Sequence, residues 1–190
     1  MKKIIIGITG ATGSIYAFKL IEFLIENNIE VHIIASENGK KVFSYELEFS
    51  YEDWIKKLKS KGNIHEHSPE NLFANISSGS FITHGMIVLP CSMGTLGRIA
   101  NGSSDNLIIR ASDVCLKEKR PLILCVRETP YNMIHLKNML SVTQSGGIVM
   151  PLSPSFYTKP NCIDDIVNSI IGRILDLLKI DNSLIKRWEY

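Results

Sequence analysis

The chain has 190 residues, of which 45% are hydrophobic and 21% are charged, a balance typical of a folded globular domain. Its net charge of +2 and its short apolar runs exclude a bulk attraction to nucleic acid and a membrane-spanning helix, so we expect neither as a partner. The four cysteines form no CxxC pair, which predicts no metal site and no disulfide framework, and which favours the reducing cytoplasm.

Strand-like and helix-like segments alternate along the chain, which predicts a parallel sheet covered by helices. The first strand, at residues 3–9, is an unbroken β-rich apolar run of the kind that is buried on both faces. The elements that follow in chain order are a helix at 15–27, a strand at 30–35, a helix at 39–46, a charged surface segment at 51–61, a loop or short edge strand at 65–71, a strand at 86–90, helices at 95–100 and 111–119, a strand at 121–126, a helix at 134–142, a short strand at 147–151 and a helix at 163–178. We therefore expect a single α/β domain over residues 1–190, with one doubly wound, mostly parallel sheet and helices on both faces.

A glycine-rich turn, GITGATGS at residues 7–14, joins the first predicted strand to its helix. Glycines at such a turn let the backbone approach an anion, and the amides of the helix start point at it. The spacing is not that of the GxGxxG dinucleotide fingerprint. The second strand ends in Ala35 and Ser36 rather than in an acid, although Glu37 is adjacent. This favours a mononucleotide over a dinucleotide, while plain tight packing of the turn and a helix N-cap at Ser36 stay open as alternatives.

Polar groups also follow two later strands. Ser92 and Thr95 place hydroxyls after the strand at 86–90, at the sheet edge where α/β proteins bind ligands, although helix capping explains them equally well. Arg127 and Glu128 end the strand at 121–126. The arginine is suited to hold a phosphate through two hydrogen bonds, and the glutamate is suited to proton transfer if burial raises its pKa. The alternative is a local ion pair between them.

Taken together and in order, these segments resemble the UbiX-type flavin prenyltransferases over nearly the whole chain. The matching stretches are GITGATG (7–13), SSGSF (77–81), PCSMGTL (90–96), DNLI (105–108), RASDV (110–114), LKEKRPL (116–122), RETP (127–130), HLKNM (135–139), PSFY (154–157) and RW (187–188). The resemblance implies a flavodoxin-like, Rossmann-like fold. It also implies a metal-independent transferase that joins the dimethylallyl group of dimethylallyl phosphate to N5 and C6 of reduced FMN, and so makes prenylated FMN for a partner decarboxylase.

The same resemblance implies roles for individual residues. The positions that match FMN-binding residues of the family are Gly10, Ala11, Thr12, Ser36, Ser92, Met93, Gly94, Thr95 and Arg127. The positions that match its allyl phosphate contacts are Tyr157 and Arg173, with Lys117 and Arg110 as further anion contacts. The positions implicated in the chemistry are Thr12, Glu46, Glu128 and Trp188, with Glu46, Glu128 and the phosphate itself as candidate bases. In such proteins the site is shared between subunits of a homo-oligomer, often a dodecamer.

The chain departs from the family pattern at a few positions. Thr12 stands where serine is common, and Ser77 where alanine is usual. Gly97 and Arg98 replace a pair of small residues, and Arg98 brings a charge to the crevice that the resemblance does not explain. The alternatives are a flavin-dependent decarboxylase of peptidyl- or pantothenoyl-cysteine and a non-catalytic FMN-binding subunit of a decarboxylase. The former carries asparagine where Gly94 stands. The allyl donor is a monophosphate or a diphosphate, and the resemblance favours the monophosphate.

Overall fold

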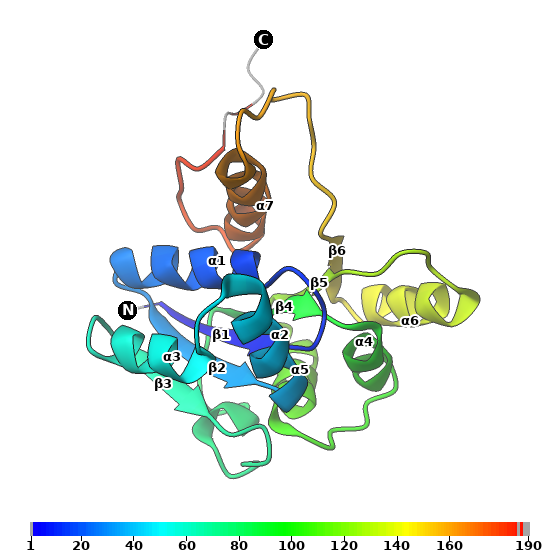
Figure 1. Ribbon diagram of the computed structural model, residues 1–190. Helices are drawn as coiled ribbons and strands as arrows, with labels where there is room; N and C mark the ends of the chain where they lie inside the picture. Colours follow the sequence, from blue (N-terminus) through cyan, green and yellow to red (C-terminus); the bar gives the residue numbers. More distant parts are fainter. Residues whose placement is uncertain (1, 186, 188–190) are drawn as a thin grey trace.

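The computed structural model describes residues 2–185 and residue 187 (Figure 1). Its strands are β1 (Lys3–Ile8), β2 (Glu30–Ala35), β3 (Ile64–His67), β4 (Gly85–Cys91), β5 (Leu122–Val126) and β6 (Ile148–Pro151). Its helices are α1 (Ser14–Glu26), α2 (Glu37–Leu47), α3 (Tyr51–Lys59), α4 (Met93–Ala100), α5 (Leu107–Lys117), α6 (Met133–Gln144) and α7 (Ile163–Leu177), with a 3-10 turn at Asn75–Ser77. None of these helices is long and apolar enough to cross a membrane.

The six strands form one sheet in the order β3-β2-β1-β4-β5-β6, and every neighbouring pair is parallel. The predicted doubly wound α/β fold is therefore confirmed. The chain moves outward in one direction from β1 to β3, and then returns to β4 beside β1 and moves outward in the other direction. The strand order thus reverses between β1 and β4, and the carboxyl ends of these strands are where open α/β sheets bind ligands.

Helices cover both faces of the sheet because successive strand residues point to opposite sides. On β1, Ile4, Ile6 and Ile8 pack into a cluster with α1, α3 and α7, whereas Ile5 joins a second cluster with α4 and α5. The two clusters explain why the central strands are apolar without alternation. This rigid core fixes the position of the loops at the carboxyl edge.

The segment predicted as charged surface at 51–61 is instead the amphipathic helix α3, so that expectation is wrong. Its buried residues Tyr51, Trp54, Ile55 and Leu58 follow the helical period. Trp54 stacks against Phe43 of α2 with ring centroids 4.6 Å apart. The lysines and acidic residues of the segment cover only its outer face. The apolar stripe on its inner face packs against α2.

The polar segment predicted as a loop or edge strand contains the edge strand β3, and its histidines pack on β2. His65 and His67 stack on the buried ring of His32, with ring centroids 4.8 and 5.2 Å away. Glu30 Oε1 lies 3.0 Å from His32 Nε2 and 3.2 Å from Lys3 Nζ. Glu30, His32 and His65 are side chains of the kinds that bind metal ions, and they lie close together. The charge of the Glu30 carboxylate, however, is already balanced by Lys3.

We expect the free energy of unfolding to fall as the pH drops from 7.5 to 5. Burial, followed by the nearby His32 and His65, lowers the pKa of His67 to about 4, and burial also lowers the pKa of His32. In the unfolded chain these side chains take up protons near pH 6.5, so stability that is complete above this pH is lost as the pH falls toward 4. Allowing for solvent screening, the loss at pH 5 is about 1 kcal/mol.

Urea unfolding of the wild type and of His67→Gln at both pH values tests this expectation. The variant keeps the edge strand but cannot titrate at this position, so the drop in stability should shrink by at least half. An equal drop in both proteins would show that the pH dependence has another source.

Candidate functional site

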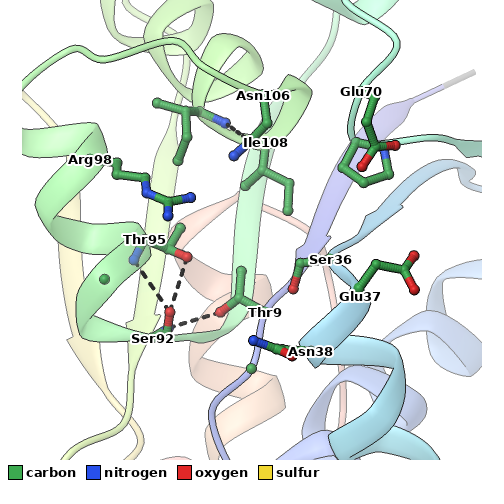
Figure 2. Close-up of a pocket in the computed structure, with 14 residues that line it drawn as sticks. Thr9, Ser36, Glu37, Asn38, Glu70, Ser92, Thr95, Arg98, Asn106 and Ile108 are labelled. Carbon is green, nitrogen blue, oxygen red and sulfur yellow. Dashed lines mark hydrogen bonds between the residues drawn. The ribbon is translucent and has the colours of Figure 1, made fainter.

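A cavity of about 390 Å³ lies at the carboxyl edge of the sheet, where the strand order reverses between β1 and β4. The starts of α2 and α4 flank it, and Figure 2 shows polar side chains from both helices around it. Its lining residues are Thr9, Gly10, Ser36, Glu37, Asn38, Pro69, Glu70, Ser92, Gly94, Thr95, Arg98, Asn106, Ile108 and Ile109. The cavity therefore joins the end of β1, the two helix starts and an apolar wall from α5.

The α4 side of the cavity is a hydroxyl network. Thr9 Oγ1 donates to the Pro90 carbonyl (2.7 Å) and accepts from the Ser92 amide (2.8 Å), which ties the ends of β1 and β4 together. The hydroxyls of Ser92 and Thr95 lie 3.0 Å apart, and Ser92 Oγ accepts from the Thr95 amide (Figure 2). Ser92 is thus the N-cap of α4. Capping uses a lone pair of the Ser92 oxygen, and only one of the two hydroxyls donates to the other, so one O–H group stays available to a ligand. Helix capping and ligand binding by these hydroxyls are therefore compatible.

The α2 side repeats this arrangement. Ser36 caps α2 by accepting from the Gly39 amide at 3.1 Å. A Cβ on Gly10 would lie 2.8 Å from Asn38 Cβ, so only glycine allows the turn after β1 to approach α2 this closely. Gly94 is different, because no atom lies within 4 Å of its missing Cβ. Its lack of a side chain keeps space open in the cavity.

The charges around the cavity are divided between its two sides. Arg98 extends from α4, while Glu37 and Glu70 lie opposite, near α2 and the loop after β3 (Figure 2). Glu37 is paired with Lys40 at 3.0 Å, whereas Arg98 Nε lies 3.7 Å from Asp105. An anionic group is therefore favoured on the α4 side of the cavity and repelled on the other.

The start of α1, where the glycine-rich turn suggested a ligand anion, is occupied by a carboxylate of the chain itself. Glu46 on α2 accepts from the amides of Gly13 (3.0 Å) and Ser14 (2.8 Å). Burial opposes ionisation of Glu46, but these bonds and that from the Thr12 hydroxyl outweigh it and hold its pKa below the usual value. Glu46 is therefore an anion at neutral pH and satisfies the donors expected to point at a ligand. The amides of Gly13 and Ser14 are therefore already bonded within the chain, whereas binding of a ligand by Gly10, Ala11 and Thr12 stays a prediction.

Tyr157 and Arg173 lie together at a second place. Both line a cavity of about 230 Å³ between the loop 155–161 and α7, and a neighbouring one of about 370 Å³ beside β6. Arg173 Nη1 lies 3.1 Å from Asp176, yet its side chain is 60% exposed. The missing Cβ of Gly13 would lie 3.3 Å from Leu152, just after β6. The glycine-rich turn thus runs from the first cavity toward the strand that borders the second.

Arg127 and Glu128 directly follow β5, as predicted. Within the described part of the chain they form no ion pair with each other, so the alternative of a local Arg–Glu pair is not found. The Arg127 amide donates to the Cys91 carbonyl at 3.3 Å, which places it beside the α4 loop. Its guanidinium is exposed.

Other residues predicted for the site lie apart from both cavities. On α5, Arg110 donates to Asp113 and to the Ser77 carbonyl, and Lys117 pairs with Glu118. Met93 is buried at the start of α4 and does not line the cavity. Trp188 lies outside the described residues.

Several residues that line the first cavity carry no motif that marks them in the sequence. Asn38, Pro69 and Glu70 were not predicted for the site, although all three line the cavity. Arg98, expected near the crevice but without a role, lines it as well. Pro69 and Glu70 follow β3, and the carboxyl ends of parallel strands meet at one edge, so recognising β3 as a strand would have placed them there.

Comparison with known proteins agrees with this geometry. The family model described as Flavoprotein matches residues 1–175. The flavin prenyltransferase UbiX of Methanocaldococcus jannaschii is 48% identical over 186 residues, which cover 98% of this chain and 98% of that protein. A crystal structure of AnUbiX (PadA1) in complex with FMN and dimethylallyl pyrophosphate is similar with a TM-score of 0.93 and 39% identity, covering 100% of this chain and 98% of that one. A dodecameric FMN-dependent UbiX-like decarboxylase from Escherichia coli O157:H7 has a TM-score of 0.91 and 41% identity, covering 99% of this chain and 100% of that one.

Proposed function

The chain belongs to the flavoprotein family and, within it, to the UbiX-type flavin prenyltransferases, and from this basis we propose how its residues divide the reaction. It is a transferase that joins a dimethylallyl group to FMN. The observation that carries our assignment is that the glycine-rich turn begins at a cavity lined by hydroxyls and ends beside Leu152, next to the strand that borders the cavities lined by Tyr157 and Arg173. We assign FMN to the first cavity and the phosphate of the allyl donor to the second.

The residues of the first cavity fit FMN. Ser36, Ser92 and Thr95 offer hydroxyl donors, and the apolar side chains of Ile108 and Ile109 form the opposite wall. The open space over Gly94 leaves room for a flat ring system. Because the start of α1 is taken by Glu46, the phosphate of FMN is left with the donors at the other helix starts, of which the start of α4 also has the positive charge of Arg98 beside it. Reduced FMN supplies the nucleophilic positions N5 and C6 that accept the dimethylallyl group.

Arg173 and Tyr157 hold and stabilise the phosphate that leaves the allyl carbon. As the carbon–oxygen bond breaks, negative charge grows on the phosphate oxygens, and a guanidinium placed there in advance stabilises it. We assign the allyl group to the neighbouring cavity of about 370 Å³, which Tyr157 and Arg173 also line, because Met150, Ile170 and Leu177 form part of its wall. These apolar side chains exclude water from a carbon that becomes cation-like.

Glu46 and Thr12 form a unit at the start of α1. The lowered pKa of Glu46 makes its carboxylate a weak base, so we assign it to orienting the Thr12 hydroxyl rather than to removing the C6 proton. That proton goes to Glu128 or to the departing phosphate, which are the remaining candidate bases. The extra methyl group of Thr12 restricts its rotamers relative to serine, and the bond to Glu46 holds the hydroxyl in place.

We further propose that the site is completed by other copies of the chain in a homo-oligomer, as in the dodecameric relative. Exposed apolar side chains gather on α6, at Met133, Ile134, Leu136 and Leu140, and such a surface marks an interface. Assembly would also bring Arg110 and Lys117 to a neighbouring site. The partner that uses the product is a separate decarboxylase, and the free cysteines suit a cytoplasmic location.

The test is to incubate the protein without oxygen with reduced FMN and dimethylallyl phosphate, and then to measure the mass of the flavin. We expect the flavin mass to rise by one dimethylallyl unit. A parallel incubation with the diphosphate decides between the two donors. Tight FMN binding with an unchanged flavin mass in both incubations would contradict the proposal and support a non-catalytic FMN-binding subunit.

A further inference from the structure

Arg98 lies on the cavity side of α4, where the family pattern has a small residue. It follows Thr95 by one helical turn, so both side chains project from the same face of the helix. Both line the cavity that we assign to FMN, and Figure 2 shows the Arg98 guanidinium above Thr95 on that side. An arginine at this position adds a charge to a wall that otherwise offers hydroxyls.

The guanidinium of Arg98 is largely uncommitted. Among the described residues its only ion pair is with Asp105, at 3.7 Å through Nε, and its side chain is 56% exposed. No hydrogen bond of its two terminal nitrogens is found within the same part of the chain. Those nitrogens carry four of the five guanidinium donors, and their fork geometry matches two oxygens of a phosphate.

The surroundings leave one side of the cavity for an anion. Glu70 lines the far side and repels a phosphate there, while Glu37 beside it is already paired with Lys40. The start of α1 is neutralised by Glu46. The start of α4, with the Thr95 hydroxyl and the nearby guanidinium, is therefore the cationic part of the cavity.

We propose that Arg98 binds the phosphate group of FMN and makes this chain select FMN over riboflavin. This inference rests on the proposed function, because it assumes that FMN occupies the cavity. Arg98 acts as a positioning and specificity residue: it holds the phosphate end and does not touch the reacting atoms. No bond is made or broken in this step.

Binding of FMN and of riboflavin, which lacks the phosphate, tests the proposal in the full-length protein. We expect Arg98→Ala to raise the Kd of FMN by about 10- to 100-fold, as for loss of a charge-assisted hydrogen bond. The Kd of riboflavin should change by less than about twofold. Arg98→Lys keeps the charge without the fork and should fall between the wild type and the alanine variant. Asp105→Asn releases the guanidinium and should leave FMN affinity equal or higher.

The control is Lys57→Ala, which removes a positive charge from the exposed face of α3. It should change neither affinity. Equal losses of FMN and riboflavin affinity in Arg98→Ala, or no loss of either, would overturn the role of Arg98. If Arg98→Ala does not fold, the ratio of FMN affinity to riboflavin affinity is compared between Arg98→Lys and the wild type. An equal ratio in the two proteins would overturn the proposal. Failure of the wild type to bind FMN would instead refute the proposed function.

Discussion

Glu46→Gln should lower kcat/KM for prenyl transfer by about 100-fold or more, as expected when a group that orients a proton donor or acceptor is disabled. The carboxylate accepts bonds from the Gly13 and Ser14 amides and from the Thr12 hydroxyl. A glutamine has the same shape, but its amino group accepts none of these bonds. The Thr12 hydroxyl would then lose its fixed orientation beside the flavin cavity.

Measuring FMN affinity distinguishes the loss of Thr12 orientation from a general loss of structure. Glu46 does not line the first cavity, so the Kd of FMN should stay within about threefold of the wild-type value. Loss of a charge-assisted hydrogen bond to FMN would change it much more. The matched control is Glu26→Gln at the exposed end of α1, which should leave turnover unchanged. Turnover is measured by anaerobic mass spectrometry of the flavin. If Glu46→Gln turns over at the wild-type rate, Glu46 has no role in the reaction.

Arg173→Ala should lower kcat/KM for the allyl phosphate by about 10- to 150-fold, which corresponds to one charge-assisted hydrogen bond of 1.5–3 kcal/mol. Arg173 shares its cavities with Tyr157, and most of its side chain stays exposed despite the bond to Asp176. Because its effect is on the leaving phosphate, the loss should appear with saturating FMN. The Kd of FMN should not change.

Two further variants make this result specific. Arg173→Lys keeps the charge and should retain part of the activity, although a lysine cannot form the paired bonds of a guanidinium. Lys61→Ala removes an exposed charge far from this cavity, at the turn before β3, and should have no effect. If Arg173→Ala weakened FMN binding and turnover to the same degree, the division of the two ligands between the two cavities would be incorrect.

Local patterns predicted the framework of this protein well. The second strand was predicted at 30–35, where β2 lies, and the predicted N-caps at Ser36 and Ser92 are present. The ordered set of motifs led to the correct family. These inferences succeed because burial on both faces, capping and turn formation depend on residues a few positions apart. The apolar stripe of α3 follows an equally local rule, but charged residues alternate with it along the sequence.

Contacts between distant segments decided the rest. No local rule reveals that Glu46 reaches the start of α1, because that bond joins positions 32 residues apart. The same holds for His32 and His67, which meet only when β3 pairs with β2, and for Arg98, which gains a role from the loops facing it across the cavity. The sequence alone determined the central strands, most of the helices and the family. Tertiary structure decided which donors are already satisfied and which remain for a ligand, because a hydrogen-bonding group is available only after every distant partner has been placed.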